Sequence, residues 1–191
     1  MKNVFLYSDP HFGHHNAACV FKNKDGSPLR PYSSAEEMDE DMVQRYNDKV
    51  KPTDKVYFLG DVVINKKNLP ILERLNGDKI LIKGNHDIEK AHVYLKYFRD
   101  IRAYHVLNGF ILSHIPVHTS QLPRFGFNIC GHLHSNKVLL DNGEEDLRYK
   151  CVCVEQTGFA PVNFNDIISE MNERKKILSV MYPDNKKYQI I

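Results

Sequence analysis

Short apolar segments that each end in a polar loop constrain the fold of this chain more than any other feature. The runs Val4–Tyr7, Lys55–Leu59 and Lys79–Ile82 have the length of buried strands, and two later runs end at Leu112 and Cys130. The loops that follow them are Asp9-Pro10-His11, Gly60-Asp61, Gly84-Asn85-His86-Asp87, Ser113-His114 and Gly131-His132-Leu133-His134. Because ligands bind outside the carboxyl ends of strands in parallel sheets, we expect these loops to meet on one surface.

Helical patterns separate the first three strands. The segment Ser34–Lys49 is predicted as a helix, because Ser34 and Glu37 form a capping box and apolar residues recur along one face. Leu69–Leu75 and Ile88–Phe98 carry shorter helical patterns. The alternation of strand and helix predicts right-handed crossovers and a parallel sheet.

The second half of the chain is richer in strands. Ala103–Leu107 and Phe110–Leu112 flank Asn108-Gly109, a pair that favours the type I′ turn of a hairpin. Further strands are predicted at Phe127–Cys130, Lys137–Leu140 and Arg148–Glu155, and a closing helix at Asn163–Lys176. The sequence has no internal repeat or linker, so residues 1–191 are predicted to form one domain.

The composition is that of an ordinary globular protein. Of the 191 residues, 42% are hydrophobic and 26% charged, which excludes a disordered or fibrous chain. The formal net charge of +2 is too small to favour a nucleic-acid or membrane partner, and no apolar run approaches the ~18 residues of a membrane span. Cys151 and Cys153 alternate with valines, as buried thiols in a strand do. We therefore expect reduced cysteines and a cytoplasmic protein.

The polar loops carry the ligand types of a metal centre. Together they offer carboxylate, amide and imidazole groups, which suit one or two divalent cations such as Mn, Fe, Co, Ni or Zn. Asp-x-His or Gly-Asp alone is common in proteins, whereas Gly-Asn-His-Asp after a buried strand is a more selective indication of a metal centre. Gly-His-x-His is of intermediate selectivity. The combination of all five at successive strand ends is hard to attribute to chance.

These five motifs resemble the complete signature of the calcineurin-like metallophosphoesterase superfamily, from Asp9 to His134. The segments Ser8–His14 and Val154–Val162 are also similar to a small single-domain branch from bacteria and phages, described as predicted phosphoesterases. The resemblance implies an α/β fold in which two mixed β-sheets pack as a sandwich with helices on the outer faces. It also implies two divalent metal ions, with Mn²⁺ favoured over Fe, Ni, Co or Zn.

A ligand set for each metal follows from the resemblance. One ion would be held by Asp9, His11, Asp61 and His134, and the second by Asp61, Asn85, His114 and His132. Asp61 would bridge the two ions, because a carboxylate can neutralise part of the charge on both. Asn85 would add an oxygen ligand without a further negative charge to repel phosphate.

Other residues in or near these loops could serve catalysis or substrate binding. The resemblance implies His86 as the general acid toward the leaving-group oxygen. Asp87 is a candidate to orient His86, with a loop-capping role as the alternative. His14, His118 and Arg124 are candidate substrate contacts, the last as a bidentate phosphate ligand, with solvent-exposed loop positions as the alternative.

The expected function is that of a dinuclear metal-dependent phosphoesterase in which a metal-bridging hydroxide attacks phosphorus. Protein Ser/Thr phosphatases follow Gly-Asp with Asp-Arg-Gly, whereas Asp61 is followed here by Val62-Val63-Ile64. The missing arginine favours a phosphodiesterase acting on a nucleotide-type or other small diester, with a short nucleic acid as a further candidate substrate.

Three alternatives to this function stay open. The first is a phosphomonoesterase acting on a small phosphorylated metabolite, and the second is a two-metal hydrolase of another bond, such as an amide. The third is a non-catalytic metal-binding interaction module of the same fold. The complete ligand set argues against the module, and Gly-Asn-His-Asp argues against amide hydrolysis.

Overall fold

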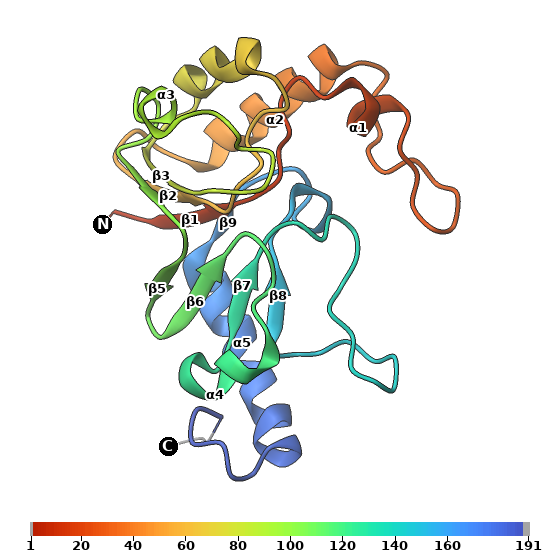
Figure 1. Ribbon diagram of the computed structural model, residues 1–191, viewed down its shortest axis with the longest axis vertical. Coiled ribbons are helices and arrows are strands. Elements are labelled where there is room, and N and C mark those ends of the chain that lie inside the picture. Colours follow the sequence, from red (N-terminus) through yellow and green to blue (C-terminus); the bar gives the residue numbers. More distant parts are fainter. Residues whose placement is uncertain (1, 189–191) are drawn as a thin grey trace.

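The computed structural model describes residues 2–188 as a mixed α/β fold with two β-sheets (Figure 1). The first sheet contains, in spatial order, β4 (Asp100–Arg102), β3 (Asp78–Ile82), β2 (Lys55–Phe58), β1 (Val4–Tyr7) and β9 (Val162–Asn163). Strands β1 to β4 run parallel, and β9 is antiparallel to β1. The predicted parallel core of the first half is therefore confirmed.

The second sheet contains β5 (His105–Leu107), β6 (Phe110–Ser113), β7 (Asn128–Cys130) and β8 (Tyr149–Cys151), in that order. Strands β5 and β6 form the predicted antiparallel hairpin, whereas β6, β7 and β8 run parallel. A parallel bridge between Ser8 and Cys153 lies just beyond β1 and β8. The ends of the two sheets that carry the polar loops are thus brought close together.

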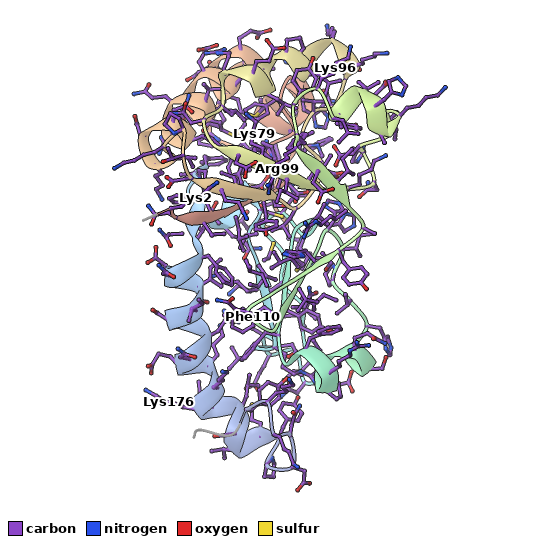
Figure 2. The ribbon with its side chains drawn as sticks, turned by 90° about the vertical axis from the view of Figure 1, so that its left-hand side faces the viewer. Lys2, Lys79, Lys96, Arg99, Phe110 and Lys176 are labelled. Carbon is purple, nitrogen blue, oxygen red and sulfur yellow. The ribbon has the colours of Figure 1, made fainter. Side chains whose placement is uncertain are left out.

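Two buried clusters hold these layers together. One lies between the first sheet and a helical layer formed by α2 (Ala35–Lys49), the 3₁₀ helix η1 (Lys66–Arg74) and α3 (Ala91–Tyr94). The other contains Leu6 of the first sheet, Leu112 of the second and Phe164 of α5 (Phe164–Met181). Figure 2 shows Phe110 between the second sheet and α5, where its ring centroid lies 6.0 Å from that of Phe164.

Several predicted elements differ from those observed. The helical pattern Ile88–Phe98 yields only the single turn α3, because the chain must enter β4 at Asp100 to pair with Ile80. Lys137–Leu140 joins neither sheet and forms only an isolated bridge between Leu139 and Glu145.

The predicted capping box of α2 is half formed. The Ser34 hydroxyl accepts from the Glu37 amide at 3.0 Å, but the Glu37 carboxylate accepts from the Ser33 amide instead of that of Ser34. The remaining short helices are α1 (His15–Cys19), η2 (Thr119–Gln121), α4 (Leu122–Phe125) and η3 (Val154–Gln156).

Two further features concern the oxidation state of the cysteines and the presence of a membrane-spanning helix. All four cysteines are free thiols, and Cys130, Cys151 and Cys153 share a small buried cluster. Between residues 2 and 188, no helix combines the length and the apolar character that a bilayer crossing requires.

Candidate metal centre

The polar loops meet where the carboxyl ends of strands from the two sheets face each other. Backbone hydrogen bonds tie them together: the Asp9 amide donates to the Gly60 carbonyl, and the His11 amide to the Asp61 carbonyl, both at 3.1 Å. The Gly131 amide likewise donates to the His114 carbonyl at 2.9 Å. The His86 amide donates to Asp61 Oδ1 and the His132 amide to Asp9 Oδ2, both at 2.8 Å, so the five loops form one surface.

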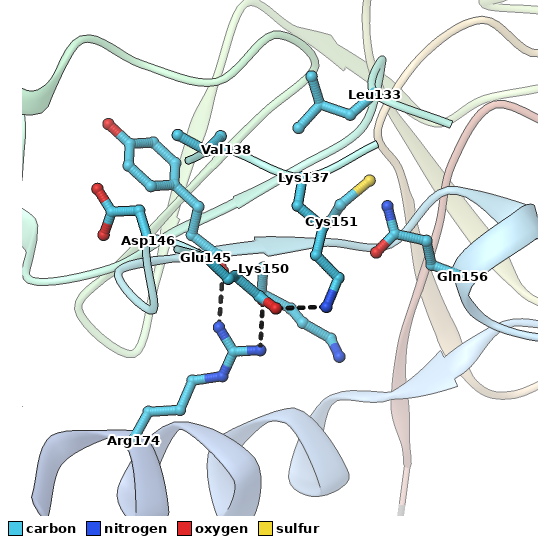
Figure 3. Close-up of a pocket in the computed structure, with 10 residues that line it drawn as sticks. Leu133, Lys137, Val138, Glu145, Asp146, Lys150, Cys151, Gln156 and Arg174 are labelled. Carbon is cyan, nitrogen blue, oxygen red and sulfur yellow. Dashed lines mark hydrogen bonds and ion pairs between the residues drawn. The ribbon is translucent and has the colours of Figure 1, made fainter. Parts of the chain in front are cut away.

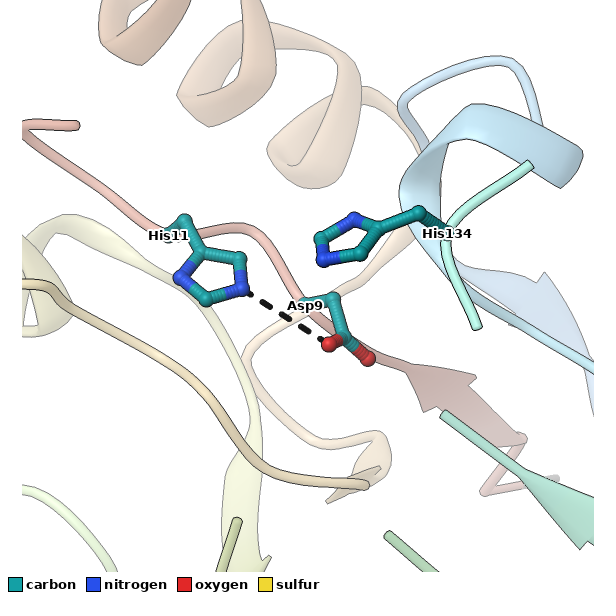
Figure 4. Close-up of side chains that lie close together, drawn as sticks. All are labelled: Asp9, His11 and His134. Carbon is teal, nitrogen blue, oxygen red and sulfur yellow. Dashed lines mark ion pairs between the residues drawn. The ribbon is translucent and has the colours of Figure 1, made fainter. Parts of the chain in front are cut away.

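Two groups of side chains on this surface have the spacing of metal ligands. Asp9, His11 and His134 form the first half-site, and Asp61, His114 and His132 form the second half-site. Within each half-site, one potential ligand atom from every residue lies within 4.8 Å of the others. Figure 4 shows the three side chains of the first half-site pointing toward one another.

Asp61 lies between the two half-sites. Its Oδ2 atom is 3.6 Å from Nε2 of His11 and 3.4 Å from Nε2 of His114. His114 Nε2 is also 2.9 Å from the Asn85 side-chain oxygen. The structure therefore brings together all seven residues predicted as metal ligands, with the predicted bridging carboxylate in the middle.

Hydrogen bonds from the opposite ring nitrogens hold two of the imidazoles in a ligating orientation. His114 Nδ1 lies 2.7 Å from the Leu59 carbonyl, and His134 Nδ1 lies 2.9 Å from Oε1 of Glu155. Acceptors at Nδ1 hold a proton there and direct Nε2 toward the half-sites, which is the usual arrangement around metal-ligating histidines.

Several buried polar atoms of the first half-site lack a protein partner. Asp9 Oδ2 accepts from the Ser8 hydroxyl at 2.5 Å, the His132 amide at 2.8 Å and the Cys153 thiol at 3.1 Å. In contrast, Asp9 Oδ1 and both ring nitrogens of His11 are buried with no hydrogen-bond partner among residues 2–188. Buried polar atoms are rarely left unpaired, so this pattern fits a ligand that these atoms would bind.

The backbone at the site is strained. Five of the seven predicted ligands have positive φ angles, namely Asp9 (57°), His11 (49°), Asp61 (54°), His132 (68°) and His134 (51°). Such conformations cost about 1–3 kcal/mol each in residues other than glycine, and they cluster at functional sites. A Cβ on Gly84 would overlap the Asp61 carboxylate, and one on Gly131 would lie 2.5 Å from Asp9 Oδ2. These glycines let the chain approach the carboxylates closely.

The electrostatics favour cation binding. Burial opposes ionisation of Asp9 and Asp61, but interactions with His11 and His114 hold the pKa of both carboxyl groups below the ordinary value of 3.8. Burial lowers the pKa of His114, but the contact with Asp61, the negative charges of Asp9 and Asp61 and the Leu59 carbonyl together outweigh it and raise that pKa to about 9. Two ionised carboxylates are thus available to the half-sites, and a metal would have to displace a proton from His114.

His86 and Asp87 follow Asn85 but have different surroundings. His86 is exposed, its ring centroid lies 5.3 Å from that of His11, and its amide donates to Asp61 Oδ1 at 2.8 Å. The buried Asp87 carboxylate accepts from the amides of Asp61, Val62 and Gly84 at 2.8–3.1 Å. The structure thus favours the loop-capping alternative for Asp87 over contact with the His86 ring.

Of the three predicted substrate contacts, His14 lies beside the first half-site. Its ring centroid is 5.6 Å from that of His11, and its half-buried ring has a buried Nδ1 without a partner among the described residues. His118 is exposed and caps η2 by accepting from the Ser120 amide at 3.2 Å.

Arg124 is placed away from the site. It lies in α4, before β7, whereas His132 follows β7, and Figure 1 shows α4 at the end of the second sheet farthest from the first. Strands β6 and β7 are parallel, so their connection must return to the starting end of β7. The structure thus places Arg124 away from the predicted metal ligands.

Sequence reasoning missed two buried residues beside the first half-site. Arg30 and Glu155 form an ion pair with 2.7 Å between their charged atoms, and Glu155 in turn contacts His134. Glu155 lies in the segment that resembles the small bacterial and phage branch. This resemblance is the only feature of the sequence that points to a role for Glu155. Arg30 stands in a loop without a motif.

A separate small cavity of about 40 Å³ lies beside the loop that carries His132 and His134 (Figure 3). Glu145 forms ion pairs with Lys137 and Arg174 there, and Leu133 and Gln156 also line the wall. This volume accommodates a few water molecules at most, so it is no substrate site.

Comparisons with known proteins place the chain in a family. The chain is 32% identical over 188 residues to the uncharacterized protein MJ1445 of Methanocaldococcus jannaschii, covering 93% of this chain and 96% of the relative. The chain belongs to the same family as that protein. A scan against models of protein families gives no match.

A solved structure has the same fold. The protein of unknown function AQ665 from Aquifex aeolicus superposes with a TM-score of 0.61 at 22% identity, over 88% of this chain and 99% of that protein. This likeness bears on the fold alone.

Proposed function

We propose that this protein is a dinuclear metal-dependent phosphoesterase of the calcineurin-like superfamily, that its two sheets pack as the sandwich of that superfamily, and that it acts on a small phosphodiester. The observation that carries the proposal is the position of Asp61 between two half-sites of matching chemistry. A shared carboxylate flanked by imidazoles is the arrangement that a two-metal hydrolase requires.

The ligand chemistry fits two divalent cations, with Mn²⁺ favoured. Asp9, His11, Asp61 and His134 would hold one ion, and Asp61, Asn85, His114 and His132 the other. When bound, two such ions supply Lewis-acid activation of the attacking water and of the phosphoryl oxygens. The unpaired buried atoms of Asp9 and His11 support this fit.

His86 is placed to donate a proton to the leaving group. Its side chain is exposed beside Asn85 and next to His11, so a substrate at the half-sites could reach it from solvent. The hydrogen bond from its amide to Asp61 fixes its backbone relative to the bridging carboxylate. A general acid in this position contributes about 10²–10⁴-fold to the rate.

The lack of a free arginine near the predicted ligands, among the described residues, favours a diester over a monoester as the substrate. A phosphomonoester dianion calls for an additional cationic contact, whereas a diester carries one negative charge. Arg30 is buried and fully engaged with Glu155 and two backbone carbonyls, and Arg124 lies in α4. No other arginine in residues 2–188 has a contact with the seven predicted ligands. The monoesterase alternative would need a cation from elsewhere.

The test compares hydrolysis of bis-p-nitrophenyl phosphate and p-nitrophenyl phosphate with Mn²⁺ or EDTA. We expect Mn²⁺-dependent turnover of the diester that falls to background in Asp61→Asn and is unchanged in Asp141→Asn, a matched change at an exposed loop residue. Preference for the monoester would support the monoesterase. Absence of turnover in folded, metal-loaded protein would contradict catalysis and favour the non-catalytic module.

His86→Gln tests the general acid separately. The substitution should lower kcat much more for diesters with poor leaving groups, such as phenyl esters, than for p-nitrophenyl esters, which leave without protonation. His92→Gln is the matched control, because His92 is exposed in α3 and has no described contact with the predicted ligands. An equal loss on both kinds of ester would contradict the assignment of His86.

A further inference from the structure

The first half-site is built around one buried cation, Arg30. The side chain of Arg30 is fully buried, and it donates to the carbonyl of Asp9 at 2.8 Å and to that of Pro10 at 2.7 Å. These carbonyls belong to the turn that carries Asp9 and His11, both in the strained left-handed region. Arg30 therefore holds the backbone that presents two of the three half-site residues.

The same guanidinium reaches the third residue through Glu155. Nε of Arg30 donates to Oε1 of Glu155 at 2.9 Å, and Nη2 forms an ion pair with the same oxygen at 2.7 Å. That oxygen also accepts from His134 Nδ1 at 2.9 Å. A single carboxylate oxygen thus connects Arg30 to the His134 ring, across segments 125 and 21 residues apart in the chain.

The second half-site has different supports. His114 is oriented by the Leu59 carbonyl, and the Asp61 amide is held by Asp87. Neither Arg30 nor Glu155 has a hydrogen bond or ion pair with these residues in the described part of the chain. The two half-sites are joined by the Asp61 carboxylate and by the His132 amide, which donates to Asp9 Oδ2 at 2.8 Å, whereas Arg30 and Glu155 support only the first half-site.

We propose that Glu155 and Arg30 are positioning residues that set the divalent-cation affinity of the first half-site independently of the second. This inference rests on the proposed two-metal centre. The Glu155 carboxylate fixes the His134 ring with its proton on Nδ1 and makes Nε2 a stronger donor to a metal. Arg30 balances the buried negative charge and keeps the carboxylate at a fixed place.

Glu155→Gln tests the proposal, because glutamine keeps the shape and removes the charge. In titrations with Mn²⁺ followed by calorimetry and by metal analysis after dialysis, we expect two ions per wild-type chain. The variant should bind one of them about 10–100-fold more weakly and the other unchanged. Raising the Mn²⁺ concentration should restore hydrolysis, which a general structural defect would not allow.

A matched control and a second variant keep the test decisive. Glu170→Gln removes a carboxylate that also bonds two cations, Lys150 at 3.0 Å and Arg174 at 2.8 Å, but lies in α5. The Glu170→Gln variant should bind both Mn²⁺ ions with the affinity of the wild type. Should Glu155→Gln fail to fold, Arg30→Lys replaces it, because lysine keeps the charge but cannot bridge Glu155 and both carbonyls.

The outcomes separate this proposal from the proposed function. Unchanged affinity for both ions in a folded variant, or equal weakening of both, would overturn the positioning role and leave the phosphoesterase proposal standing. Selective weakening in a protein that hydrolyses no phosphoester would support the positioning role and contradict the enzyme. A wild-type chain that binds no Mn²⁺ would overturn both.

Discussion

Replacement of Arg30 by methionine should destabilise the fold far more than loss of a surface ion pair. The side chains of Arg30 and Glu155 are 0% and 3% exposed, and their charged atoms lie 2.7 Å apart. Without Arg30, the Glu155 carboxylate stays buried with His134 as its remaining donor. The carbonyls of Asp9 and Pro10 also lose the donor that now pairs them.

The size of the effect follows from these contacts. Breaking a buried ion pair by removing one partner costs about 3–5 kcal/mol, or a factor of roughly 10²–10⁴ in the folding equilibrium. A buried carbonyl left without a donor adds about 1–3 kcal/mol. Since folded domains are typically stable by about 5–15 kcal/mol, Arg30→Met should remove a large share of the stability.

Urea denaturation followed by circular dichroism, in EDTA, measures this loss. The double variant Arg30→Met/Glu155→Gln should be destabilised by less than the sum of its single variants, because the two buried charges are then removed together. Arg74→Met is the control: Arg74 makes two 2.6 Å hydrogen bonds to Glu40 on the surface, and its loss should leave the midpoint unchanged. A loss below about 1 kcal/mol in Arg30→Met, or strict additivity, would refute the reasoning.

Three further predictions concern other parts of the fold. Burial raises the pKa of Asp39 from 3.8 to about 6, so the contribution of Asp39 to stability should fall as the pH rises from 4 to 6. Asp39→Asn, which still accepts from Gly13, should raise the Tm at pH 7 but not at pH 4. Gly131→Ala would place a Cβ 2.5 Å from Asp9 Oδ2 and should therefore lower the Mn²⁺ affinity measured by calorimetry. An unchanged affinity would contradict this prediction. Ile129→Ala empties a fully buried position of β7 and should cost about 2–5 kcal/mol in urea denaturation; a smaller loss would mean that the core closes around the gap.

The predicted ligands could be found from sequence because each follows a strand with a strong local pattern. Val4–Tyr7 is recovered as β1 with the predicted bounds, and β2 and β3 differ from prediction by one residue each. Once parallel pairing is predicted, the carboxyl ends of these strands must share an edge, which brings Asp9, Asp61 and Asn85 together.

The supports of the site could not be predicted in the same way. Arg30 and Glu155 meet across 125 residues, and neither stands in a pattern that signals burial. Arg124 was assigned to the site because it lies between two ligand motifs. The parallel pairing of β6 and β7 instead sends that connection to the far end of the sheet.

Crystals grown with Mn²⁺ and measured at the manganese absorption edge test the central claim most directly. The account predicts two anomalous peaks, one in contact with Asp9, His11 and His134 and the other with His114 and His132, on either side of Asp61. A single peak, no peak, or peaks away from these side chains would contradict the two-metal centre.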